Sequence, residues 1–172
     1  MTGIDFCPEL IEAARETAAS QGRDIQFELG DMLRMPFRDD QFQLIVSNHS
    51  VNEVDDVSLL FREFARVLKK RAGRLVILML HPCFSGWVSN DDSEYGPDRV
   101  GRKAYEVAGA CSPKVATAHV TTLERYIEAL CAAELGITGF KELRPTRTQV
   151  EGESRCATQA SSPRFLLIEA MN

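Results

Sequence analysis

The sequence lacks several features that would assign it at once to a class of protein. No apolar run approaches the ~20 residues that a membrane-spanning helix needs, and no basic start with an apolar core suggests a signal peptide. The formal net charge is −5, so no excess of positive charge favours binding to nucleic acid or to an anionic membrane. These absences predict a cytoplasmic protein with neither a membrane nor a nucleic-acid partner.

Paired cysteine motifs and closely spaced glycines are also missing. The five cysteines include no C-x-x-C pair, and an odd, scattered set argues against a zinc site or a disulfide framework. We therefore expect no metal site and a reducing compartment. No G-x-G occurs anywhere in the chain. The cysteines are Cys7, Cys83, Cys111, Cys131 and Cys156.

What the sequence does contain is an alternation of strand and helix patterns in a single domain of 172 residues. The apolar run 42–47 is typical of a strand buried on both faces. Such alternation implies parallel crossovers and an α/β sheet, which two final strands complete. We expect strands over 1–5, 25–29, 42–47, 74–80, 137–143 and 164–170, and helices over 8–22, 57–70 and 121–134.

Between His81 and about Ala118 the pattern breaks down into a stretch rich in Gly, Ser, Asp and Pro. A loop of this length in a compact domain is typically a lid, a substrate segment or a disordered stretch. We assign that role to residues 81–120 within one domain that spans residues 1–172.

Two aspartates follow predicted strands at the edge of the sheet where ligands bind. Asp5 could accept hydrogen bonds from both hydroxyls of a ribose, as in NAD and S-adenosylmethionine (SAM) sites, or it could cap the next helix. Asp31 could accept from an adenine amino group while the Met32 N–H donates to a ring nitrogen, or the two could form an ordinary turn.

Several blocks, in order, resemble the class I SAM-dependent methyltransferases that act largely on small molecules. The blocks are "GIDFCPELIEAAR", "GDMLRMPFRDDQFQLIVSN" and "FREFARVLKKRAGRLVILML", and the resemblance resumes in "TTLERYIEALCAAELGITGFKELRP" and "SPRFLLIEA". It implies a Rossmann-like methyltransferase sheet with a C-terminal antiparallel hairpin, and SAM as the cofactor.

The resemblance also implies roles for individual residues. Asp5 binds the ribose, with Phe6 beside it, and Asp31 and Met32 hold the adenine. Asn48 lies near the methionine part of SAM and the reacting methyl group. All five are cofactor-binding residues on this interpretation.

The chain departs from this family at its start. The family's sheet has a central first strand that leads into a glycine-rich turn against the cofactor, and neither is present here. We therefore expect a sheet that is incomplete at the N-terminus, with two unpaired edges that favour self-association. A native start upstream of Met1, a degenerate relative and a strand supplied by a second chain are the three explanations.

A general base is needed only if the acceptor must lose a proton. His49, Glu53 and His81 are the candidates, each with a structural or solvated role as the alternative, and we name His49 and His81 as the catalytic pair. Cys83, Phe84 and Trp87 could line an acceptor pocket or pack the 81–120 segment onto the sheet.

The sequence thus predicts methyl transfer from SAM to a small organic acceptor on O, N or C. A non-catalytic Rossmann-like interaction module is the first alternative, and a nicotinamide-dependent oxidoreductase is the second. The acceptor, the methylated atom and the oligomeric state do not follow from the sequence.

Overall fold

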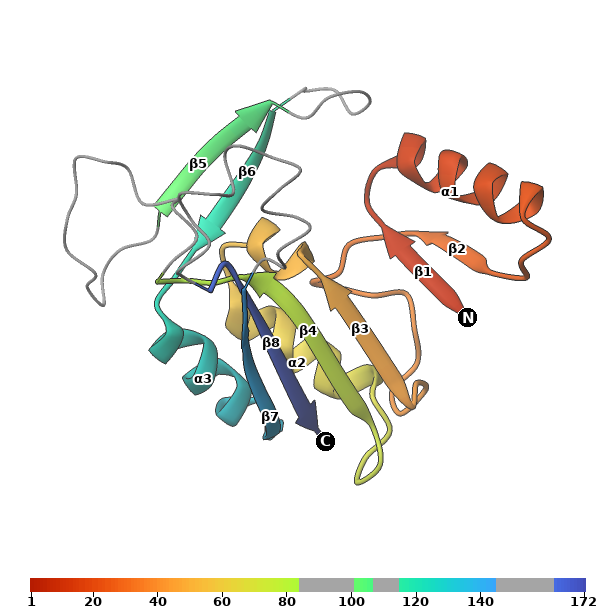
Figure 1. The fold of residues 1–172 in the computed structure, drawn as a ribbon. Coiled ribbons are helices and arrows are strands. Elements are labelled where there is room, and N and C mark those ends of the chain that lie inside the picture. The colour runs from red at the N-terminus through yellow and green to blue at the C-terminus, as the bar shows by residue number, and fades with distance from the viewer. Residues whose placement is uncertain (84–100, 107–114, 145–162) are drawn as a thin grey trace.

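The computed structural model of the chain describes residues 1–83, 101–106, 115–144 and 163–172 (Figure 1). Every predicted helix and strand has a counterpart at nearly the expected place. The stretch predicted as one loop differs, because it contains two further strands. In chain order the elements are β1 Thr2–Asp5, α1 Pro8–Ser20, β2 Gln26–Leu29, β3 Leu44–Asn48, the 3-10 helix η1 Ser50–Glu53, α2 Val57–Val67, β4 Arg74–Leu80, β5 Gly101–Glu106, β6 Val115–Val120, α3 Leu123–Ala132, β7 Gly136–Leu143 and β8 Phe165–Met171.

Local chemistry explains where the helices begin and end. Pro8 opens α1, where its missing N–H costs no hydrogen bond, and Gly22 follows the helix with a φ of 62°. The Asp56 side chain caps α2 by accepting from the Leu59 N–H, and Thr122 caps α3 by accepting from the Arg125 N–H.

The strands form a mixed main sheet and two smaller sheets. The main sheet has the order β3-β4-β8-β7, in which β3 and β4 are parallel and β8 runs antiparallel to both of its neighbours. β1 and β2 form a separate parallel pair, and β5 and β6 form an antiparallel pair. The α/β class and the C-terminal hairpin of β7 and β8 are confirmed.

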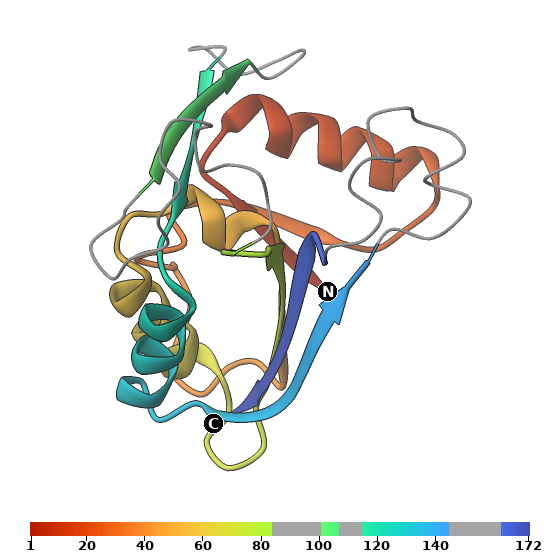
Figure 2. The same cartoon turned by 60° about the vertical axis from the view of Figure 1, so that its left-hand side comes forward.

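The core lies between the main sheet and one helical layer. α2 and α3 lie together on one side of β4, β8 and β7 (Figure 2). Alternate residues of β4 and β8 face these helices and are buried, as are the large side chains opposite them. They are Leu75, Ile77, Met79, Leu166 and Ile168 on the strands, with Phe61, Phe64, Tyr126 and Leu130 on the helices.

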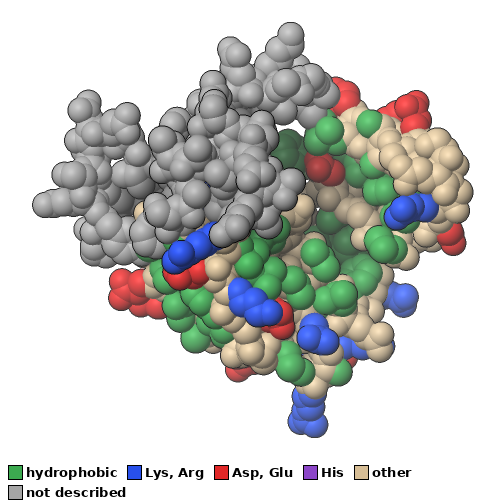
Figure 3. All heavy atoms as spheres, viewed as in Figure 1, with side chains coloured by type: hydrophobic (Ala, Val, Ile, Leu, Met, Phe, Trp, Pro, Cys, Tyr) green, Lys and Arg blue, Asp and Glu red, His purple; other side chains and the backbone are tan. Residues whose placement is uncertain are grey.

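The opposite face of the main sheet carries exposed apolar side chains among charged ones (Figure 3). Leu44 and Val46 of β3 are 53% and 64% exposed, and Met171 of β8 is exposed on the same face. The prediction that this third strand is buried on both faces is therefore wrong. Its apolar residues alternate between a covered face, with Ser47 buried, and an open one.

β1 and β3 do not pair with each other. β1 is hydrogen-bonded to β2, and β3 is hydrogen-bonded to β4, so each leaves one edge without a strand partner in the described residues. The two strands point in a similar direction on either side of a gap in the view of Figure 1. The expected unpaired edges are thus present.

The three described cysteines differ in bonding state. Cys83 and Cys131 are free thiols, whereas Cys7 is buried and disulfide-bonded, a single link that the argument against a disulfide framework did not foresee. Among the described residues no group of three or more His, Cys, Asp or Glu side chains could hold a metal ion. No helix in the described ranges is long and apolar enough to cross a bilayer.

Candidate functional site

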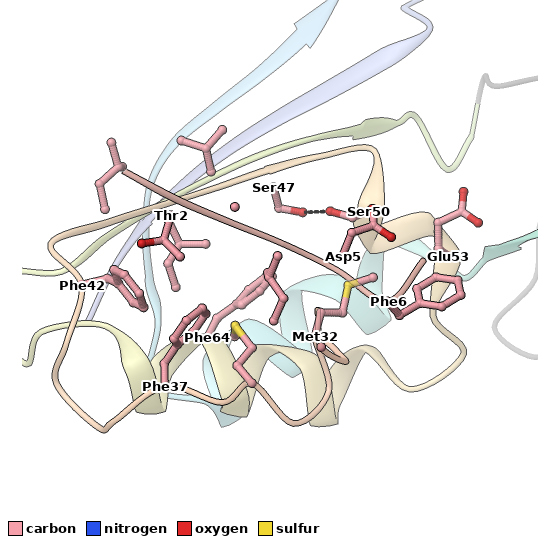
Figure 4. Close-up of a pocket in the computed structure, with 17 residues that line it drawn as sticks. Thr2, Asp5, Phe6, Met32, Phe37, Phe42, Ser47, Ser50, Glu53 and Phe64 are labelled. Atoms are coloured by element: carbon pink, nitrogen blue, oxygen red, sulfur yellow. Dashed lines mark hydrogen bonds between the residues drawn. The ribbon is translucent and has the colours of Figure 1, made fainter. Parts of the chain in front are cut away.

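A cavity of about 340 Å³ lies between β1 and β3. Its walls are residues of these two strands, of the 30–42 loop and of η1, together with Phe64 of α2. One end is apolar and the other carries polar side chains (Figure 4). Of the labelled residues, Thr2, Phe37, Phe42 and Phe64 lie toward the apolar end, and Asp5, Phe6, Met32, Ser47, Ser50 and Glu53 lie toward the polar end.

Asp5 reaches the polar end because it is the last residue of β1. Its Oδ1 accepts a hydrogen bond from the Cys7 N–H at 2.9 Å, which orders the turn into α1. The carboxylate therefore orders the turn before α1 and does not cap that helix, whose N-cap residue is Cys7 and which has no side-chain cap hydrogen bond. The Asp5 side chain also lines the cavity. A carboxylate held in this way is preorganised to accept further hydrogen bonds from a ligand.

The loop after β2 places Met32 on the cavity wall but Asp31 outside it. Asp31 is exposed, and its Oδ1 accepts from the Leu33 N–H at 2.8 Å. Gly30 lies so close to β1 that an added Cβ would be 3.0 Å from Cδ1 of Ile4. This close contact sets where the loop leaves the sheet, and hence where Met32 lies.

Two predicted residues at the end of β3, Asn48 and His49, do not line the cavity. Asn48 is exposed. His49 has a left-handed φ of 63°, donates its N–H to the Leu78 carbonyl and packs its ring edge-on against Phe165 at 5.4 Å. A non-glycine residue with positive φ marks a constrained turn, here directly beside the polar end of the cavity.

His81 is held by hydrogen bonds on both ring nitrogens. The side chain is 1% exposed, and its Nδ1 accepts from the Cys83 N–H at 3.1 Å. Because Nδ1 accepts, Nε2 carries the proton and donates to the Glu142 carboxylate at 3.1 Å. This geometry suits a positioning role at the end of β4 better than proton transfer.

Ser47 and Ser50 are cavity residues that the sequence interpretation missed. Their hydroxyl groups are hydrogen-bonded to each other at 2.8 Å, across the turn that contains Asn48 and His49. Two serines flanking a polar pair after a strand were the available signal. Phe84 and Trp87, predicted for an acceptor pocket, lie outside the described residues.

The polar end of the cavity has an acidic character. Asp5 and Glu53 both lie there, and no Lys or Arg from the described part of the chain lines the cavity. Carboxylates and hydroxyls favour a ligand with hydroxyl or amino donors, or with positive charge, over an anionic one.

Comparisons with known proteins relate this chain to methyltransferases. Residues 1–77 match the model of the methyltransferase domain family. The chain is 35% identical over 86 residues to the demethylmenaquinone methyltransferase of Deinococcus radiodurans, which is 50% of this chain and 35% of that protein. It is 35% identical over 81 residues to ajmaline N-methyltransferase of Rauvolfia serpentina, covering 46% of this chain and 27% of that protein. The chain thus spans about a third of the length of these curated relatives.

Solved structures are similar over almost the whole chain. An S-adenosylmethionine dependent methyltransferase from Mesorhizobium loti matches with a TM-score of 0.68 and 22% identity, covering 99% of this chain and 79% of that one. Geranyl diphosphate C-methyltransferase from Streptomyces coelicolor A3(2) matches with a TM-score of 0.65 and 18% identity, covering 99% and 62%. At these identities the likeness establishes the fold.

Proposed function

We propose that this chain, which carries the methyltransferase domain of the class I SAM-dependent methyltransferases, binds SAM for methyl transfer to a small organic acceptor. One observation carries the proposal: three residues predicted to bind the cofactor, Asp5, Phe6 and Met32, line the same end of one cavity. Asp5 ends β1, Phe6 follows it directly, and Met32 lies in the loop after β2.

The residues at this end fit the chemistry of an adenosyl group. The Asp5 carboxylate would accept from the ribose hydroxyls, and the exposed ring of Phe6 with the Met32 side chain would contact the purine. Asp31, next to Met32, would accept from the adenine amino group. When bound, SAM supplies an electrophilic methyl group on a positively charged sulfur, for which an acidic pocket end is favourable.

The end of β3 would serve the methionine half of the cofactor and the acceptor. Asn48 is proposed to lie near the methionine moiety, and His49 to accept a proton where the acceptor must lose one. His81 would act by positioning, because both of its ring nitrogens are occupied. Residues 81–120 remain our proposed substrate segment.

We propose a small organic acceptor because the curated relatives are named for such substrates. Demethylmenaquinone and ajmaline are the acceptors in the names of two proteins that this chain resembles. Neither assignment transfers to a chain that spans a third of their length. A cytoplasmic location and the absence of a nucleic-acid partner remain predictions.

We further propose that the sheet is incomplete between β1 and β3. The two edges face one cavity, each without a strand partner in the described residues, and Leu44 and Val46 are exposed beside it. A parallel strand placed there would pair with both edges. Without it the open edges favour association with a second copy of the chain.

The missing G-x-G and the open sheet favour one alternative, a non-catalytic interaction module. Calorimetric titration of the folded chain with S-adenosylhomocysteine (SAH), with NAD as the control, separates the possibilities. Binding of SAH but not NAD is the expected result. A folded chain that binds neither would support the non-catalytic module, and binding of NAD alone would support the oxidoreductase.

A further inference from the structure

Two charged side chains of α2, Glu63 and Arg66, hold the loop between β2 and β3 that carries Asp31 and Met32. We infer that Glu63 and Arg66 are positioning residues for the adenine end of the cofactor site. The inference rests on the proposed function, since it assumes that Asp31 and Met32 contact the cofactor.

Glu63 and Arg66 form hydrogen bonds with the loop backbone at Met35 and Phe37. The Met35 N–H donates to Glu63 Oε1 at 2.7 Å, and Arg66 Nη2 donates to the Met35 carbonyl at 3.1 Å. Both backbone groups of Met35 are therefore bound by one ion pair. Arg66 Nη1 donates to the Phe37 carbonyl at 2.8 Å and so fixes the loop two residues further on.

The two side chains also hold each other in place. Arg66 Nε and Nη2 donate to the two Glu63 carboxylate oxygens at 2.8 and 2.6 Å, and Nη1 contacts Asp39 at 2.6 Å. The guanidinium is planar, so these bonds fix the direction of those made to the loop. Glu63 is only 12% exposed, which places the pair between helix and loop rather than in solvent.

The held segment lies directly beside the proposed cofactor contacts. Met35 is buried and lines the cavity, and it follows Met32 by three residues. The intervening turn is closed by the Arg34 N–H, which donates to the Asp31 carbonyl at 3.0 Å. Because this turn is compact and its downstream end is bound to α2, a shift of Met35 shifts Met32 and Asp31 with it.

The test compares variants of two arginines on the same helix. Arg66→Met removes the side-chain donors to the loop. Arg66→Lys keeps the positive charge but lacks the planar guanidinium group, which donates to several acceptors at once. Arg62→Met is the matched control, since Arg62 is exposed and donates to Ser58 within its own helix. Calorimetry with SAH and with adenosine is combined with hydrogen exchange of residues 32–37 and with thermal unfolding, at a temperature where every variant is folded.

We expect Arg66→Met to weaken SAH and adenosine alike by about tenfold, with faster exchange in residues 32–37. The affinities of Arg66→Lys should lie between those of Arg66→Met and the unaltered chain. Those of Arg62→Met should stay within about twofold of the unaltered chain. A lower melting temperature with unchanged affinities would overturn the inference, because it would show a structural role alone. Failure of the unaltered chain to bind SAH would instead overturn the proposed function, and the positioning role with it.

Discussion

At the scale of single residues, Asp5 combines two functions in one side chain. One carboxylate oxygen orders the turn into α1, and the side chain as a whole lines the cavity between β1 and β3. A substitution that keeps the turn while removing the charge can separate these functions. Asparagine does so, because its side-chain oxygen can still accept from the Cys7 N–H.

We predict that Asp5→Asn weakens SAH binding by about 1–3 kcal/mol while leaving thermal stability nearly unchanged, because a charged acceptor for the ribose hydroxyls is lost. Asp24→Asn is the control, since Asp24 is exposed and lies outside the cavity. Calorimetric titration measures both. Equal affinities of the two variants would contradict the ribose assignment.

The Glu63 carboxyl group makes a pH-dependent contribution to stability. Hydrogen bonding from Arg66 lowers the pKa of Glu63 below its usual range. A group with a lowered pKa stabilises the fold above its unfolded-state pKa, and this contribution is lost as the pH falls through the folded-state value.

We therefore predict that Glu63→Gln reduces the free energy of unfolding by about 1–2 kcal/mol at pH 7, and that the difference from the unaltered chain shrinks below pH ~4. Urea unfolding at a series of pH values measures the change. A deficit that persists unchanged in acid would indicate a packing defect in place of a lost charge interaction.

At the scale of elements, the start of α2 depends on one cap. The Asp56 Oδ1 accepts a hydrogen bond from the Leu59 N–H at 2.9 Å. Asp56 is the residue immediately before α2, whose apolar face forms much of the core. Neighbouring Asp55 is exposed and does not cap the helix, so the pair forms a matched comparison.

Replacing the cap should destabilise the chain through α2. We predict that Asp56→Ala lowers the free energy of unfolding by about 1 kcal/mol, whereas Asp55→Ala changes it by less than about 0.5 kcal/mol. Chemical denaturation monitored by circular dichroism measures both. An equal loss in the two variants would point to general charge effects at the helix start.

At the scale of the whole molecule, the open face and edges of the sheet govern association. Leu44 and Val46 lie on the exposed face of β3, whose free edge borders the cavity. Charged residues on edge strands are a common means of preventing pairing between chains. The proposed self-association should therefore respond to charge at this strand.

We predict that the unaltered chain self-associates in sedimentation velocity experiments and that Val46→Lys shifts it towards the monomer. Leu59→Lys is the control, because Leu59 is 40% exposed on α2, away from the open face. A monomeric unaltered chain, or an equal effect of the two lysines, would contradict association through β3.

The sequence by itself determined the order and type of most elements. Apolar periodicity, Pro8, Gly22 and the capping residues act over a few neighbouring positions, so strands and helices such as β4 and α3 were predictable from local pattern. The residue types at strand ends also identified Asp5 and Met32 as candidates. β5 and β6 were not predicted, because the sequence around them is rich in Gly, Ser, Asp and Pro and lacks a clear strand pattern.

Only the tertiary structure decided which candidates meet. Asp5, Phe6 and Met32 lie on one cavity wall, while Asn48, His49 and His81 lie off it, because a strand end fixes a residue's edge of the sheet but not where its side chain points. The exposure of β3 likewise depends on what covers the sheet. Helices α2 and α3 cover one face in the described residues, and burial is set by such distant partners rather than by the strand's own sequence.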